Sequence, residues 1–285
     1  MSEFPRPEED PQTPPSMRVF QVNEDNSLEE IASAGENLPP PMQVIAPARP
    51  TPWVTYTLMG VTIVIWLAQI GTKTYWGLDW PGVWGLKLNE YIRAGQVWRL
   101  FTPMFLHDDN LPFHILTNMY FLYVVGAEME KLYGHGRYLT LYLLGGLTGN
   151  ALSFVFSRYG AWGASTSLFG LLAANGVFIL QNKNWLRDWK RALQGVVMTI
   201  GINIFLGLGI GADNWGHIGG ALGGAIFAWL AGPRWGLNAF APGLAQIKDQ
   251  RGAREWFNGA ALTFLVFLIL VVAGFLWGVP GIERQ

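Results

Sequence analysis

The chain has 285 residues, and its composition excludes an ordinary soluble domain. Only 14% of its residues are charged, whereas a soluble globular domain carries about 25%. Its 19 Lys and Arg against 20 Asp and Glu give a net charge of −1, which offers no basic surface to a phosphate backbone. The composition, with 51% apolar residues, therefore indicates a membrane protein and excludes nucleic acid as a partner.

The chain contains no cysteine. A disulfide framework, a thiolate nucleophile and a cysteine-ligated metal are therefore excluded.

The first 50 residues differ from the rest of the chain. They hold ten of its 17 prolines and lack the apolar stretch of a signal peptide. We expect residues 1–50 to form a disordered, extended cytoplasmic tail.

Seven windows without Lys, Arg, Asp or Glu follow the tail, each at or above the roughly 18 residues that cross a bilayer as a helix. The fold class is therefore an all-α polytopic membrane protein. We expect a six-helix core over residues 51–233, a cytoplasmic linker over 234–255, and a seventh transmembrane helix with a short outer tail over 256–285. The windows are 50–72, 110–127, 138–157, 159–182, 192–212, 214–233 and 256–282.

The loop charges predict the orientation in the membrane. With seven spans, thirteen of the 19 Lys and Arg fall on the side of the N-terminus and six on the other side. The short 183–191 loop alone supplies four of the thirteen. By the positive-inside rule the N-terminus is cytoplasmic and the C-terminus lies outside.

The outer loop over residues 73–110 mixes aromatic and basic side chains. Such a mixture is typical of the headgroup layer, where we expect this loop to lie; the alternative is a loop without contact with the membrane. These residues are Trp76, Trp80, Trp84, Lys87, Tyr91, Arg93, Trp98 and Arg99.

Polar side chains inside the spans are few and are predicted to share one depth. His114 with Asn118, Ser165 and His217 lie near the starts of spans 2, 4 and 6, which all run inward from the outer side in this topology. His114 and Asn118 are four residues apart and so share a helix face. Ser165 opens a span, where free backbone N–H groups favour a developing anion.

Glycine rows suggest how these groups converge. Residues 216, 220 and 224, with a second row at 219 and 223, surround and follow His217 and permit close approach of another helix. Contact between spans 4 and 6 would give an acyl-transfer arrangement. Ser165 would be the nucleophile, His217 the general base, and Asn118 with backbone N–H groups the oxyanion donors. The alternative is that the serine bonds its own helix and the glycines only pack.

No carboxylate inside the spans could complete a triad. A Ser-His dyad suffices if packing holds the imidazole, and Phe169, one turn after Ser165, is a candidate ring for it to stack on. Ordinary core filling by Phe169 is the alternative.

Over residues 53–231 the chain resembles the rhomboid intramembrane serine proteases. The similarity rests on several motifs in order: Gln96 to Arg99 and Thr102 to His107, His114-x-x-x-Asn118, Glu128 and Glu130 before Tyr133-Gly134, Gly163-Ala164-Ser165 with Phe169-Gly170, and His217-x-Gly219-Gly220. The resemblance implies a six-helix core with a Ser-His dyad that opens to the outer face and cleaves transmembrane segments of other membrane proteins. It also implies that His114 and Asn118 help to hold the oxyanion and that Trp98-Arg99 anchors the outer loop.

One residue departs from the family pattern. Thr166 follows the nucleophile where the family usually has glycine, and its side chain either crowds the substrate carbonyl or points away into the helix. We expect an active enzyme because nucleophile, base and oxyanion donors are all present. The alternative is an inactive rhomboid-like chaperone or scaffold that binds transmembrane helices.

Two other classes are disfavoured. A transporter needs a polar path through both leaflets, whereas the polar cluster stops in the outer half. A metalloprotease is disfavoured because the chain has no His-Glu-x-x-His and no carboxylate near His114 or His217, so we expect no metal and no cofactor. Without an organelle-targeting pattern, the expected location is a bacterial plasma membrane. The sequence leaves the substrate and the oligomeric state open.

Overall fold

The computed structural model describes residues 20–22, 28–30, 43–45, 50–108, 112–241 and 244–281. The chain divides into two units. One is helical and comprises residues 48–235 and 249–285, and the other comprises residues 1–47 and 236–248.

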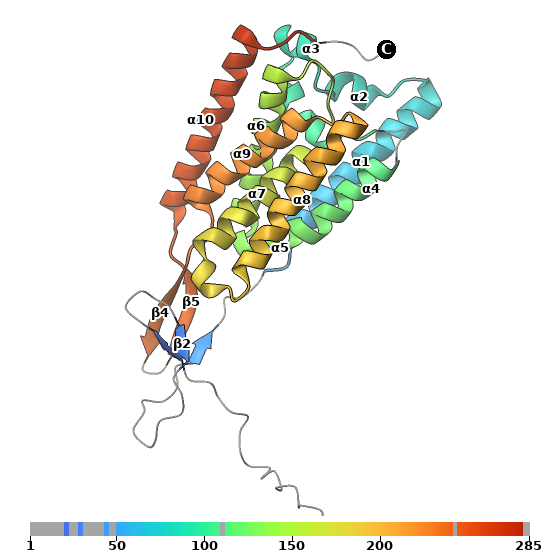
Figure 1. The fold of residues 1–285 in the computed structure, drawn as a ribbon. Coiled ribbons are helices and arrows are strands. Elements are labelled where there is room, and N and C mark those ends of the chain that lie inside the picture. Colours follow the sequence, from blue (N-terminus) through green and yellow to red (C-terminus); the bar gives the residue numbers. More distant parts are fainter. Residues whose placement is uncertain are drawn as a thin grey trace, which may run out of the picture. The chain divides into compact units, whose positions relative to one another are not determined.

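The helical unit is a bundle. The loop over residues 73–110, which is termed the outer loop after its predicted location, carries additional short helices (Figure 1). Its elements in chain order are α1 (Trp53–Trp76), α2 (Trp80–Gly85), α3 (Asn89–Arg93), the 3-10 turns η1 (Val97–Leu100) and η2 (Thr102–Phe105), α4 (Pro112–Phe121), the π-helical turn η3 (Leu122–Gly126), α5 (Ala127–Tyr133), α6 (His135–Phe156), α7 (Ser165–Gln181), η4 (Lys183–Trp185), α8 (Trp189–Ile210), α9 (Asn214–Ala231) and α10 (Ala253–Trp277).

Glycines allow α6, α7 and α9 to pack with their backbones nearly touching. A Cβ atom at Gly220 would overlap the carbonyl oxygen of Thr166 in α7, and one at Gly224 would overlap that of Gly170. A Cβ at Gly219 would lie 2.8 Å from the Thr148 carbonyl oxygen in α6. The predicted close contact between the windows 159–182 and 214–233 is therefore confirmed for α7 and α9, and the second glycine row fits α9 against α6.

Among the described residues, four helices are long and apolar enough to cross a membrane, namely α1, α6, α8 and α10, and α7 is a shorter apolar helix. The seven-span prediction is thus confirmed only in part. The window 110–127 contains all of α4 and the π-helical turn η3, and the helical stretch continues through α5 to Tyr133. The window 214–233 yields α9, whose many glycines lower its hydropathy and face other helices rather than lipid.

The buried core follows the same arrangement. Most of α6 is buried, whereas α1, α8 and α10 expose most of their apolar surface. Such outward apolar surface is what a bilayer covers. The largest fully buried side chains include Tyr138, Tyr142 and Phe154, all on α6.

Helix α10 packs along α6 and α9 (Figure 1). Arginine side chains bind the chain at both ends of this helix. Arg251, just before α10, donates to the carbonyl oxygens of Trp229 and Gly232 at the end of α9, at 2.7 and 2.8 Å. At the other end, Arg93 of α3 donates to the carbonyl oxygens of Gly274, Phe275 and Gly278. The last helix is thereby tied to the outer loop.

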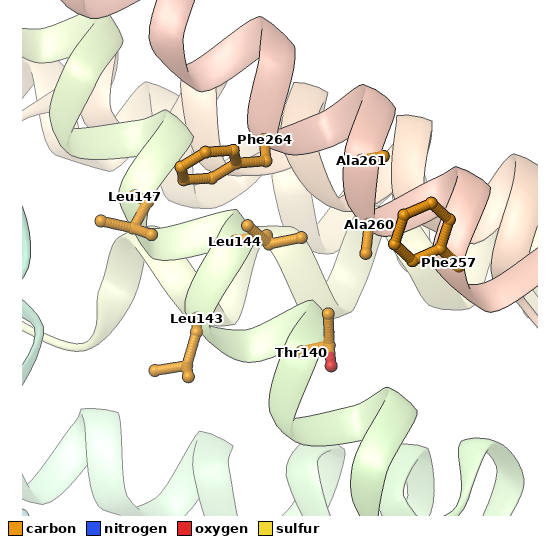
Figure 2. Close-up of a pocket in the computed structure, with 8 residues that line it drawn as sticks. All are labelled: Thr140, Leu143, Leu144, Leu147, Phe257, Ala260, Ala261 and Phe264. Carbon is orange, nitrogen blue, oxygen red and sulfur yellow. The ribbon is translucent and has the colours of Figure 1, made fainter.

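Between α6 and α10 lies an open, mostly apolar groove of about 420 Å³. Figure 2 shows the side chains of both helices that line it. They are Thr140, Leu143, Leu144, Leu147, Phe257, Ala260, Ala261 and Phe264.

The second unit contains short strands. β1 (Phe20–Val22) pairs antiparallel with β2 (Leu28–Glu30), and a three-stranded sheet has the order β3 (Gln43–Ile45), β5 (Leu244–Asp249), β4 (Trp235–Ala241). β3 and β5 are parallel, with Val44 opposite Ala245.

These strands differ from the expectation of a wholly disordered tail. The two longer strands, β4 and β5, come from the expected 234–255 linker. Residues 43–45 pair with β5, a partner about 200 residues away that the sequence around position 44 does not indicate. The rest of the expected tail, residues 1–19, 23–27, 31–42 and 46–49, and the outer tail at 282–285 lie outside the described residues.

Candidate active site

Ser165 is the first residue of α7, and the loop before it determines where its hydroxyl points. Ala164 is the N-cap residue, and its carbonyl oxygen accepts the first helical bond from Leu168 N at 3.0 Å. The N–H groups of the first turn of a helix have no partner within that helix. The half-buried Ser165 therefore lies beside free backbone donors at the positive end of the helix dipole.

His217 lies in the first turn of α9, directly across from Ser165. Its Nε2 is 3.0 Å from Ser165 Oγ, although the two residues are 52 positions apart in the chain. Asp213 starts this helix, since its Oδ1 accepts from Gly216 N at 3.2 Å and its carbonyl oxygen accepts from His217 N at 3.0 Å. Two helix starts thus bring the hydroxyl and the imidazole together.

The imidazole of His217 is held by an aromatic face. The ring of Phe169 lies parallel to it, with 4.1 Å between centroids and 6° between planes. Nδ1 of His217 is buried and has no hydrogen-bond partner among the described residues. The hydroxyl of Ser165 can donate to Nε2 in the tautomer that carries its proton on Nδ1.

Gly163 forms one wall of the site beside the serine. Its φ of 120° is a conformation that side chains rarely adopt. A Cβ atom at this position would lie 2.9 Å from His114 Nε2 and 3.6 Å from Ser165 Oγ. His114 therefore faces the same small space as the hydroxyl, and only glycine leaves that space open.

Asn118 lies one turn after His114 and is buried, with 6% of its surface exposed. Its Nδ2 donates to the carbonyl oxygen of His114 at 3.0 Å, within its own helix. This bond uses one of the two N–H groups of the amide. The structure thus places Asn118 beside His114 without a hydrogen bond to Ser165.

Thr166 points away from the hydroxyl of Ser165. A Cβ atom at Gly149 of α6 would lie 2.8 Å from Thr166 Cβ, and one at Gly216 of α9 would lie 3.0 Å from Thr166 Cγ2. The Thr166 side chain therefore fills space between α6 and α9. Of the two orientations considered for this residue, the structure has the one that points away from Ser165.

The outer loop contacts the segment that carries Ser165 at two further points, which the sequence patterns did not reveal. Pro103 accepts a hydrogen bond through its carbonyl oxygen from Gly163 N at 2.9 Å. His107 Nε2 accepts from Ala164 N at 3.5 Å, and the His107 ring lies 5.1 Å from the ring of His114. Burial lowers the pKa of His107 to about 3, so this imidazole is neutral and able to accept.

Trp98 and Arg99 bind inside the outer loop. Arg99 donates to the carbonyl oxygens of Leu86 and Val83 at 2.8 and 2.6 Å, and Trp98 Nε1 donates to that of Trp84 at 3.0 Å. These bonds connect η1 with α2.

Within the described part of the chain, no group of three His, Asp or Glu side chains is placed to hold a metal ion. The groups that meet at the site are a hydroxyl, an imidazole and the backbone donors of a helix start. Together they fit nucleophilic attack on a carbonyl with proton transfer to the imidazole.

Comparison with known proteins identifies similar sequences. Residues 94–234 match the Rhomboid domain. The chain is 40% identical over 153 residues to rhomboid protease GluP of Bacillus subtilis (strain 168), a match that covers 52% of this chain and 29% of that protein. It is 36% identical over 207 residues to RHOMBOID-like protein 1 of Arabidopsis thaliana, covering 70% and 51%, and 33% identical over 192 residues to RHOMBOID-like protein 2, covering 66% and 58%.

The matched regions span between about a third and three fifths of the length of these three relatives. The matched domain contains Ser165 and His217. It also contains the residues described around them, from Trp98 to His217.

Proposed function

Because the chain is a member of the rhomboid family, we propose that it is an intramembrane serine endopeptidase that hydrolyses peptide bonds in or near transmembrane segments. The observation that carries this proposal is the 3.0 Å separation between Ser165 Oγ and His217 Nε2. A hydroxyl at this distance from an imidazole is activated as a nucleophile when its proton moves to the ring.

In the proposed reaction, Ser165 Oγ attacks the scissile carbonyl carbon while its proton passes to His217 Nε2. The tetrahedral intermediate collapses when His217 returns the proton to the leaving amine. Water then hydrolyses the acyl-enzyme, with the imidazole again as base. The imidazole of His217 is held by its stacking on Phe169 and by burial, a role that a carboxylate has in a catalytic triad.

The oxyanion would lie in the space beside Gly163. His114 Nε2 borders this space, and the first-turn N–H groups of α7 adjoin it. One N–H group of the Asn118 amide is bonded to the carbonyl oxygen of His114. Asn118 would donate its second N–H group to the oxyanion. Preorganised donors of this kind stabilise charge that develops only in the transition state.

We further propose a membrane arrangement of six core spans, the fourth and sixth being α7 and α9, with α10 as a seventh span. The proposed domains are a cytoplasmic tail over 1–50, the core over 51–233, a linker over 234–255 and the last span over 256–285. The excess of Lys and Arg on the N-terminal side supports a cytoplasmic N-terminus and an outer C-terminus. A bacterial plasma membrane is the proposed location.

The proposed partners are transmembrane protein substrates that enter sideways from lipid. A carbonyl in a helix is already hydrogen-bonded, so a substrate must unwind locally before Ser165 can reach it. Substrates with small or helix-weakening residues near the outer face are therefore expected to be cleaved fastest.

The test compares the full chain with Ser165→Ala and His217→Ala on a generic transmembrane substrate in detergent. Cleavage by the wild type alone supports the proposal, and equal cleavage by Ser165→Ala contradicts it. Labelling by a fluorophosphonate that disappears in Ser165→Ala adds a substrate-independent readout. A chain that is neither labelled nor active, yet co-purifies with transmembrane helices, would instead be the non-catalytic scaffold.

A further inference from the structure

Lys87 is a buried cation in the outer loop, between α2 and α3. Its side chain is fully buried, at 0% exposure. Its backbone pairs with Ala161 in both directions, with Lys87 N to Ala161 O at 3.1 Å and Ala161 N to Lys87 O at 3.2 Å. Ala161 lies in the loop that leads into Ser165, four residues before it.

The ammonium group of Lys87 binds the end of α6 and the start of the same loop. Nζ donates to the carbonyl oxygens of Ser153 at 3.3 Å, Ser157 at 3.1 Å and Tyr159 at 3.0 Å. The carboxyl end of a helix is the negative end of its dipole, so a cation is favourable there. One side chain thus fixes the point where α6 turns into residues 157–164.

A carboxylate at the start of the helix that carries His217 also influences Lys87. The carboxylate of Asp213, which caps the start of α9, interacts electrostatically with the ammonium group.

We propose that Lys87 is a positioning residue that fixes the 157–164 loop, and through it the location of Ser165 relative to His217. This inference rests on the proposed peptidase activity for its kinetic consequence. The proposed effect of Lys87 on the order of the 157–164 loop does not depend on that activity.

The charge state of Lys87 agrees with this role. Burial lowers its pKa to about 8, with Asp213 acting in the opposite direction, so the amine is mainly protonated at pH 7. Only the protonated amine has three N–H donors, one for each carbonyl oxygen. Replacing Lys87 with methionine would fill a similar space and remove all three N–H donors.

The experiment compares Lys87→Met and Lys87→Arg with Arg158→Met, all in the full chain. Arg158 lies in the same loop and is exposed, so its substitution removes a nearby charge without the buried contacts. For each variant, kcat and KM are measured on a transmembrane substrate at a temperature below the melting temperature of the least stable variant. Hydrogen exchange of the amides in 157–164 is measured in parallel in a Ser165→Ala background.

We expect Lys87→Met to lower kcat by roughly 10- to 100-fold with little change in KM, since small displacements of a reacting group have effects of this size. Exchange in 157–164 should become faster. Lys87→Arg should recover part of both, because it keeps the charge and donors in a different geometry, and Arg158→Met should match the wild type.

A Lys87→Met variant with wild-type kcat overturns the proposal, as does a fall in kcat without faster exchange in 157–164. If Lys87→Met does not fold, Lys87→Arg decides by the same criterion, because its kcat and loop exchange must change together. An inactive wild type overturns the proposed peptidase function alone, and the exchange measurement still decides whether Lys87 holds the loop.

Discussion

The ring of Phe169 lies flat against the imidazole of His217, 4.1 Å away and 6° from parallel. Both rings are buried, and Phe169 sits one turn after Ser165 on the same helix. The helix that presents the hydroxyl therefore also supplies the surface that orients its proposed base.

This stacking predicts that Phe169→Leu lowers kcat. An aromatic pair contributes about 0.5–1.5 kcal/mol beyond burial, which corresponds to roughly two- to tenfold in rate if the ring orientation is lost. KM should change little because Phe169 does not need to touch the substrate. The measurement is steady-state cleavage of a transmembrane substrate.

Phe178→Leu is the matched control for Phe169. Phe178 is buried on the same helix, with its ring 5.0 Å from that of Trp235 and without contact to His217. Both substitutions should lower the melting temperature, but only Phe169→Leu should slow the reaction. Equal rates in the two variants would show that Phe169 only fills the core.

Gly163→Ala should abolish cleavage. The new Cβ would stand 2.9 Å from His114 Nε2, in the space proposed for the oxyanion. The loss should be at least as large as that of one oxyanion donor, roughly 10²- to 10³-fold in kcat. The measurement is kcat together with the rate of fluorophosphonate labelling.

Gly95→Ala separates this steric effect from backbone strain. Gly95 has a φ of 99°, and a Cβ there would meet nothing within 4 Å. Both variants should lose about 1–2 kcal/mol of stability because alanine disfavours positive φ. An active Gly163→Ala enzyme would contradict the proposed position of the oxyanion.

The lowered pKa of His107 leads us to expect a loss of stability in acid. Its folded pKa of about 3 is below its usual value of 6.5, so between these two values the unfolded chain binds the proton and the folded chain does not. The free energy of unfolding must therefore fall as the pH drops below 6.5, by about 2 kcal/mol at pH 5.

His107→Gln should remove this pH dependence. The glutamine side-chain oxygen can still accept from Ala164 N but does not titrate. The difference between the two proteins in thermal unfolding is measured at pH 7.5 and pH 5, and the other histidines cancel because both proteins carry them. If the two lose stability in parallel, His107 is not the group that titrates.

Patterns that repeat along a helix made much of the site predictable. The glycine rows around and after His217 predicted close helix contact, and that contact brings His217 to Ser165. Both residues stand at helix starts, as the span boundaries in the sequence predicted. The stacking of Phe169 followed from its spacing of four from Ser165.

Loop contacts were not predictable in the same way. Lys87 looks like any basic residue of an interfacial loop, and only the three carbonyl oxygens around its Nζ distinguish it. His107 likewise depends on the path of the chain between α2 and α4. The orientation of Thr166 is determined by the neighbouring Gly149 and Gly216, which belong to other helices.

Substrates are proposed to enter sideways from lipid, and we propose α8, the glycine-rich helix over Trp189–Ile210, as the helix that bends to admit them. In α8, which the structure describes throughout, Val196 and Gly207 are the buried residues. A Cβ atom at Gly195 or Gly201 would meet nothing within 4 Å, so close packing does not require glycine at these positions. Their remaining effect is to make the helix easier to bend, since each costs about 1 kcal/mol of helix stability relative to alanine.

Replacing both Gly195 and Gly201 with alanine should therefore stiffen α8 and slow cleavage of a transmembrane substrate, while cleavage of a soluble unfolded peptide stays unchanged. The matched control is the double substitution Gly60→Ala with Gly71→Ala in α1, where added Cβ atoms also meet nothing. Both doubles gain helix propensity, but only the α8 pair should slow the membrane reaction. Equal rates on the transmembrane substrate in the two doubles and the wild type would rule out bending of α8 as the entry step.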